Sequence, residues 1–95
     1  MDITQLFPKP HPQTAGRVID NEAVLMMADS SEIKVLNPVG SRIFELANGV
    51  MSVSEIINTL SKEYEVAEET LTIDVIEFLQ NLVQQNILIL VPKEE

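Results

Sequence analysis

The sequence predicts an α+β domain in which a three-stranded antiparallel sheet is followed by three helices. Apolar residues have the period of strands before residue 36 and recur at helical spacing after it. Two helix-start signals, Asn37-Pro38 and Ser52 with Glu55 three residues later, lie in the second part of the chain. The change of period therefore separates a sheet from a group of helices.

The predicted sheet is a meander. Strand-like runs at residues 17–19 and 22–27 flank Asp20-Asn21, two residues that tolerate the positive φ of a tight hairpin. The turn-forming residues 29–31 then lead into a third strand at residues 33–36. Three antiparallel strands follow from these signals.

The first predicted helix begins at Pro38, since Asn37 suits the N-cap and proline suits the first helical position. Its apolar stripe continues until Gly49, a residue type that often ends a helix. Ser52 and Glu55 form a capping-box pattern for a second helix over residues 53–65.

The third predicted helix runs from Glu68 to Gln85, with Asn86 as a left-handed stop. An extended apolar tail is expected at residues 87–91. At the other end, three prolines between residues 8 and 12 favour an extended backbone with little hydrogen bonding of its own. We therefore predict a flexible N-terminal arm over residues 1–16 and a folded domain over residues 17–91.

Length and composition exclude several classes of protein. Ninety-five residues are enough for one domain, and the chain has no cysteine and one histidine. A disulfide framework, a thiolate metal site and a thiol nucleophile are therefore excluded, and we expect no metal or cofactor. No signal peptide or run of about 18 apolar residues is present, which favours a cytoplasmic protein without a membrane span.

Charge argues against nucleic acid as a partner. The formal net charge is −9, and the third predicted helix carries Glu68, Glu69, Asp74 and Glu77 without any Lys or Arg. A helix that reads DNA needs basic residues along the phosphates. The acids lie without a basic or histidine partner nearby in sequence, so we also expect no enzymatic activity.

The third predicted helix has more apolar surface than one partner element can cover. Its core-facing residues are predicted to be Leu71, Val75, Phe78, Leu79 and Leu82. Ile73, Ile76 and Val83 widen the apolar sector to roughly 220°. Either the N-terminal arm or the tail folds over this second stripe, or the stripe forms a groove for a partner.

The third strand, residues 32–36, provides a second element of such a groove. A strand at the edge of a sheet can leave backbone N–H and C=O groups free to accept an extended peptide. Glu32 and Lys34 are also residue types that protect an edge from pairing, so a simple edge strand is the alternative.

Several of these segments together resemble the PqqD family. The resemblance is carried by EAVL at residues 22–25, VLNPVGSRIFEL at 35–46, Gly49, SEI at 54–56, Tyr64 and DVIEFLQNL at 74–82. The family comprises the peptide chaperone of pyrroloquinoline quinone biosynthesis and related recognition elements of ribosomally made, modified peptides. Its fold is a winged helix-turn-helix unit with three strands and three helices.

The resemblance implies a non-enzymatic peptide chaperone. It would bind the leader segment of a precursor peptide as an added strand and present it to a modifying enzyme, such as a radical SAM protein, in a pyrroloquinoline quinone or other pathway. The implied peptide-binding residues are Glu32, Ile33, Lys34, Val35, Leu36, Ile73, Ile76, Gln80 and Val83. The competing interpretation is a generic interaction adaptor, or a self-associating domain that forms a homodimer, with no leader peptide as cargo.

Overall fold

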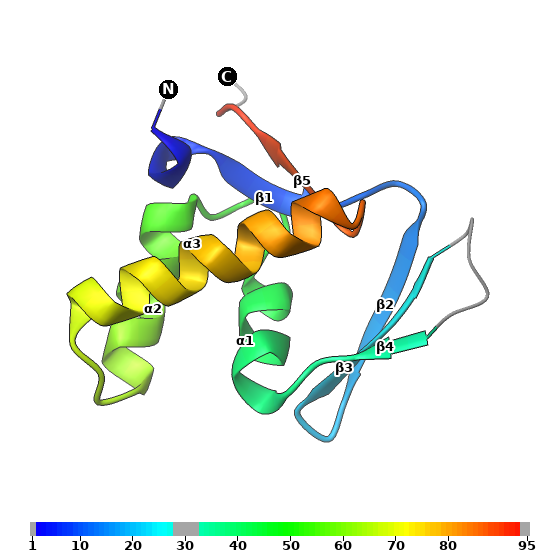
Figure 1. The fold of residues 1–95 in the computed structure, drawn as a ribbon, viewed down its shortest axis with the longest axis horizontal. Coiled ribbons are helices and arrows are strands. Elements are labelled where there is room, and N and C mark those ends of the chain that lie inside the picture. Colours follow the sequence, from blue (N-terminus) through cyan, green and yellow to red (C-terminus); the bar gives the residue numbers. More distant parts are fainter. Residues whose placement is uncertain (1, 28–32, 94–95) are drawn as a thin grey trace.

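The computed structural model describes residues 2–27 and 33–93 (Figure 1). The elements in chain order are η1 (Ile3–Gln5), β1 (Phe7–Pro10), β2 (Thr14–Ile19), β3 (Glu22–Met27), β4 (Ile33–Val35), α1 (Pro38–Leu46), α2 (Val53–Glu63), α3 (Glu68–Gln84) and β5 (Leu88–Val91). Strands β2, β3 and β4 form one sheet, and β1 and β5 form a second one. None of the helices in the described part of the chain has the length and apolar character needed to cross a membrane.

The three-stranded sheet confirms the predicted antiparallel meander. Strand β3 lies in the centre and pairs with β2 on one side and β4 on the other. Asp20 and Asn21 join β2 to β3 with φ values of 50° and 65°. Two consecutive positive φ angles are those of the tight hairpin turn whose twist suits the flanking strands.

Both helix-start signals act as predicted. The Asn37 side-chain oxygen accepts a hydrogen bond from the Gly40 N–H at 2.7 Å, and Pro38 is the first residue of α1. Ser52 and Glu55 form a reciprocal capping box at the start of α2. These bonds pair backbone donors that a helix N-terminus would otherwise leave free.

Helix α1 ends at Leu46, three residues before the predicted glycine stop. Gly49 does adopt a left-handed φ of 86°, but its N–H donates to the Pro8 carbonyl at 2.9 Å. The glycine therefore shapes the connection between α1 and α2 and attaches it to β1.

Helix α3 ends close to the predicted position. Asn86 has a φ of 61°, and the next N–H, from Ile87, donates to the Leu82 carbonyl at 2.9 Å. The left-handed residue turns the chain from α3 into β5, which confirms the expected extended tail.

The N-terminal segment differs from the predicted flexible arm. Residues 7–10 pair with β5, from Phe7 opposite Val91 to Pro10 opposite Leu88, and β2 already begins at residue 14. Pro8 and Pro10 lack an N–H, so they occupy positions at which the ladder to β5 needs no donor. The folded unit therefore begins well before residue 17.

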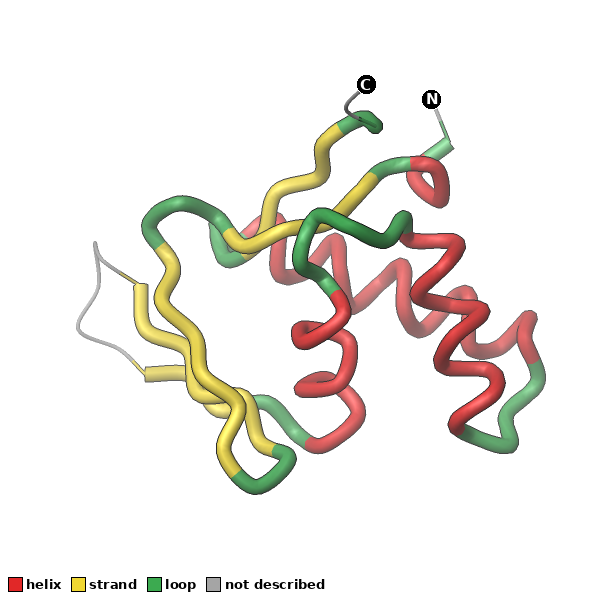
Figure 2. Tube along the Cα trace, turned by 180° about the vertical axis from the view of Figure 1, so that it is seen from behind, coloured by secondary structure: helices red, strands yellow, loops and turns green. Residues whose placement is uncertain are grey.

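The helices pack on one side of the three-stranded sheet, and the β1–β5 pair lies along the end where both termini emerge (Figure 2). The buried apolar residues come from every layer: Ala23, Leu25, Leu36, Ile43, Phe44, Ala47, Val53, Ile56, Ile57, Leu60, Leu71, Val75, Leu79, Leu82, Ile87 and Leu88. Phe78, predicted to belong to this core, is only partly buried at its edge.

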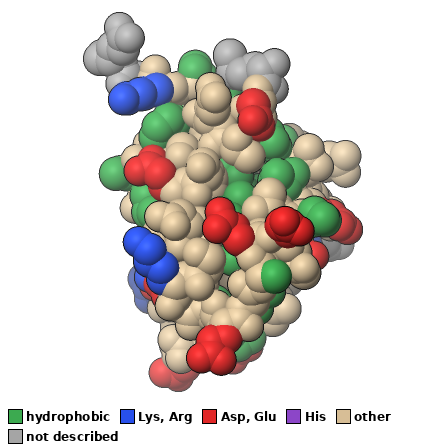
Figure 3. Space-filling model, turned by 90° about the vertical axis from the view of Figure 1, so that its left-hand side faces the viewer, with side chains coloured by type: hydrophobic (Ala, Val, Ile, Leu, Met, Phe, Trp, Pro, Cys, Tyr) green, Lys and Arg blue, Asp and Glu red, His purple; other side chains and the backbone are tan. Residues whose placement is uncertain are grey.

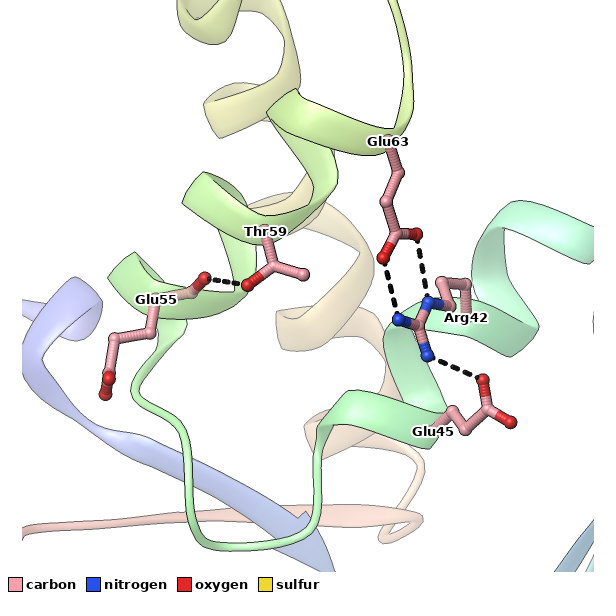
Figure 4. A network of polar contacts seen from close by, with 5 residues as sticks. All are labelled: Arg42, Glu45, Glu55, Thr59 and Glu63. Atoms are coloured by element: carbon pink, nitrogen blue, oxygen red, sulfur yellow. Dashed lines mark hydrogen bonds and ion pairs between the residues drawn. The ribbon is translucent and has the colours of Figure 1, made fainter.

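A polar network fastens α1 to α2 at the surface (Figure 4). Arg42 donates two hydrogen bonds to the carboxylate of Glu63, at 3.0 and 2.7 Å, and a third to Glu45 at 2.9 Å. The Arg42 guanidinium lowers the pKa of the Glu63 carboxyl from its ordinary value.

Candidate functional site

The free edge of β4 is the first component of the site. Strand β4 is the last in the order β2-β3-β4, and no strand among the described residues pairs with its other edge. The Leu36 N–H donates to the Ala23 carbonyl at 2.9 Å, which fixes the alternation of the ladder. The backbone N–H and C=O groups of Ile33 and Val35 therefore point away from β3, toward the open edge.

A buried hydroxyl holds β4 in place. Ser41 Oγ, on α1, accepts from the Ala23 N–H at 2.6 Å and donates to the Leu36 carbonyl at 3.1 Å. Ser41 is 1% exposed. The hydroxyl completes the ladder where β3 and β4 diverge and joins this point to the first turn of α1.

The side chains of β4 divide between two faces of the sheet. Lys34 lies opposite the buried Leu25 and reaches across to α3, where its Nζ donates to Gln85 Oε1 at 2.8 Å. Ile33 and Val35 alternate with Lys34 and project to the outer face, where they are 60% and 55% exposed.

One flank of α3 carries Phe78 and Asn81 and leads to Gln85, the C-cap residue next to β4. Gln85, which caps the helix, is bonded to Lys34, and a Cβ on Gly40 would come within 2.9 Å of the Phe78 ring. Phe78 and Asn81 also line a depression of ≈ 270 Å³ together with two acids, Asp74 and Glu77. Apolar, amide and acidic groups thus lie along this flank of α3.

The helix residues predicted from the sequence lie on the other flanks of α3. At about 100° per residue, Ile76 and Val83 are displaced from Phe78 by about 160° and 140°. Both are partly buried against the core, and Ile73 and Gln80 are exposed. Three of the four are apolar and can contact a peptide only by packing, and the side-chain hydrogen bond that joins β4 to this end of the helix goes to Gln85.

Most of the strand residues predicted from the sequence lie in β4 or directly after it. Ile33, Lys34 and Val35 form β4, and Leu36 is buried at 4% exposure directly after it. Glu32 lies outside the described residues. The edge predicted to accept a peptide is therefore free at Ile33 and Val35, whereas Leu36 contributes to the core.

The predicted site residues do not include Asn81 or Gln85, and Phe78 is assigned to the core, because a helical wheel gives the width of an apolar stripe without saying which flank faces which neighbour. One signal was available. The helix positions 74, 78, 81 and 85 share a face that is apolar only at Phe78, which is the pattern of a flank at the border of the core.

Acidic and basic side chains both appear at the α2 end of the molecule. Figure 3 shows the face seen from the side of α2 and the beginning of α3, where Asp and Glu are spread among apolar and polar groups. At the other end of α3 the Lys34 cation lies against Gln85, the C-cap residue. Among the described residues, no group of three or more His, Cys, Asp or Glu could hold a metal ion.

Comparisons with known proteins point to one family. The family model described as "Coenzyme PQQ synthesis protein D (PqqD)" matches residues 22–88, from β3 to the first residue of β5 and well over half of the chain. A search of curated proteins gave no match.

Two solved structures share the fold. One is described as "TbiB1 in Complex with the TbiA(beta) Leader Peptide"; it is 30% identical, with a TM-score of 0.79, over 84% of this chain and 93% of that one. The other, "Lasso peptide synthetase B1 complexed with the leader peptide", is 20% identical, with a TM-score of 0.78, over 87% of this chain and 98% of that one. On the family match and the fold together, the chain belongs to the PqqD family.

Proposed function

We propose that this protein is a non-enzymatic peptide chaperone that binds the leader segment of a ribosomally made precursor peptide and presents it to a modifying enzyme. The observation that carries the proposal is the edge of β4, beside the end of α3, with which no strand of residues 2–27 or 33–93 pairs, in a member of the PqqD family. The related TbiB1 structure contains a leader peptide, which supports the same ligand class here.

The leader would add to the sheet as a strand next to β4. The backbone groups of Ile33 and Val35 supply hydrogen bonds for any sequence, while side-chain contacts with α3 select among peptides. We place the side chains that select the peptide, here called the reading flank, at Phe78, Asn81 and Gln85, because Gln85, the C-cap of α3, is bonded to Lys34 of β4. The protein would act in the cytoplasm, in the pathway of pyrroloquinoline quinone or of another modified peptide. A radical SAM protein is one candidate for the modifying enzyme.

A heteronuclear NMR titration tests binding and location together. The labelled chain is titrated with synthetic leader peptides of the precursors encoded beside its gene. Amide shifts at residues 33–36 and at 78, 81 and 85 support the proposal. Shifts on the helix confined to 73, 76, 80 and 83 would move the reading flank to the stripe that the sequence suggested. Absence of any shift at high peptide concentration would favour the interaction adaptor or self-associating domain.

Two proline variants test strand addition itself. In Val35→Pro the lost N–H is one that faces the open edge, so we expect a folded protein whose leader affinity falls at least tenfold. In Lys34→Pro the lost N–H belongs to the ladder with β3, so we expect loss of folding. Unchanged leader affinity in a folded Val35→Pro would show that the peptide does not pair with β4.

A further inference from the structure

The outer face of the three-stranded sheet is an apolar surface whose large side chains remain exposed among the described residues. Side chains that oppose one another in the register share this face, and they come from all three strands. The apolar residues that form it are Ala15, Ile19, Val24, Met26, Ile33 and Val35. Ile19 and Met26 are each 52% exposed, which matches the exposure of Ile33 and Val35. A hollow of ≈ 280 Å³ lies among the β2 and β3 residues.

The area of this surface is large enough for a docking site but too small to hold a stable complex without further contacts. Four large side chains slightly more than half exposed give a patch on the order of 300–400 Å², the range in which a single patch on a monomer is often functional. A standard stable interface buries about 800 Å² per partner. A second copy of the chain is a poor occupant for the same reason, and because each copy carries a net charge of −9.

The free edge of β4 lies at the border of the same surface. The two residues whose backbones are open to an added strand, Ile33 and Val35, are also the two whose side chains belong to the outer face. Residues that face each other across a strand pair project to the same side of a sheet. Every second residue of an added leader would therefore project on the same side as Ile33 and Val35 and would widen this face by one strand spacing, about 4.8 Å.

We propose that the outer sheet face is the docking surface for the precursor-modifying enzyme and that the bound leader completes it. The inference rests on the proposed function, since the leader must occupy the β4 edge. The enzyme partner is expected to offer an apolar surface, since the two exposed charged residues on this face, Arg17 and Glu22, carry opposite charges. The domain loaded with leader then binds the enzyme more tightly than the empty domain does.

The test uses the full chain, its leader peptide and the modifying enzyme encoded beside its gene. Leader affinity is measured by fluorescence anisotropy and enzyme affinity by biolayer interferometry, with and without leader. Saturating leader should raise the affinity for the enzyme about tenfold, and by linkage the enzyme should raise the affinity for the leader by the same factor. Met26→Glu should leave leader binding to the isolated domain within twofold and weaken enzyme binding at least tenfold.

A matched variant separates docking from general effects of an added charge. Val66→Glu also replaces an exposed apolar residue, 45% exposed, but lies in the loop between α2 and α3, away from the sheet. It should bind the enzyme like the unmodified chain.

Other outcomes overturn the inference. If Met26→Glu binds the enzyme as strongly as the unmodified chain does, the docking surface lies elsewhere. If the affinity for the enzyme does not depend on leader, the bound leader is not part of the docking surface. Sedimentation showing a dimer that Met26→Glu dissociates would make a second copy the occupant. Failure of the unmodified chain to bind leader at all would remove the proposed function itself, and is visible in the anisotropy measurement alone.

Discussion

Replacing Ser41 by alanine tests whether one buried hydroxyl fixes the strand that is proposed to receive the leader. The hydroxyl stands between two buried backbone groups, the Ala23 N–H and the Leu36 carbonyl, whose residues are 0% and 4% exposed. In Ser41→Ala, the Ala23 N–H loses its partner in a place that water does not reach. A carbonyl at the root of β4 loses one as well.

The expected cost follows from these two groups. A buried donor left without a partner costs about 1–3 kcal/mol. We expect Ser41→Ala to lower the free energy of unfolding by about 2–3 kcal/mol, a large part of the 5–15 kcal/mol typical of small domains. Urea denaturation at pH 7 followed by circular dichroism measures it, provided that the m-value of the variant matches that of the unmodified chain.

Ser61→Ala is the matched control. The Ser61 hydroxyl donates to the Asn58 carbonyl at 2.7 Å, but this bond is exposed on α2. Its removal should cost less than about 0.5 kcal/mol. Equal, small effects of the two substitutions would show that Ala23 and Leu36 can pair directly without the hydroxyl, and that Ser41 does not hold β4 in place.

Three further predictions concern stability. Leu79→Ala, at a site with 0% exposure, should cost about 2–5 kcal/mol in urea denaturation, and a cost below 1 kcal/mol would contradict its place in the core. Asn21→Gly should leave stability unchanged or raise it by up to about 1 kcal/mol, since glycine adopts the positive φ at this turn position without strain; clear destabilisation would argue against the turn. Because Arg42 lowers the pKa of Glu63, their pairing stabilises the fold above the ordinary pKa of 4.5 and is lost as pH falls through the lowered value. The effect should be at most about 1 kcal/mol, both side chains being about one-third exposed, and Arg42→Gln should remove it from a pH series of unfolding curves.

The features that could be predicted from the sequence are those with a local physical cause. Asn37, Ser52 with Glu55, and Asp20-Asn21 act through hydrogen bonds or backbone angles within a few residues. These signals define where β3, α1 and α2 begin, and hence the order of the sheet and helices. The open edge of β4 follows from the same order, because the third strand of a meander has one neighbour.

The features that were missed depend on contacts between distant parts of the chain. The pairing of β1 with β5 has no local signal in the sequence. The prolines of β1 suggest a segment without hydrogen bonds, and only the register with β5 shows that they occupy positions that need no donor. Gly49 ends no helix because its N–H is used by β1. The end of α3 that lies beside β4 is identified by the bond between Lys34 and Gln85, which lie 51 positions apart.

The pairing of β1 with β5 also has a consequence for the order of folding. Bringing Phe7 opposite Val91 closes a loop of nearly the whole chain, whereas the β2–β3 hairpin closes over two residues. Loop closure over a long segment costs more entropy, and contacts of this kind slow folding. We expect the β1–β5 ladder to form last and to open first in native-state hydrogen exchange, with the amide of Ile89 less protected than that of Leu25. A transiently opened molecule would then retain the meander and its free edge, so recognition of a peptide need not wait for the last step of folding.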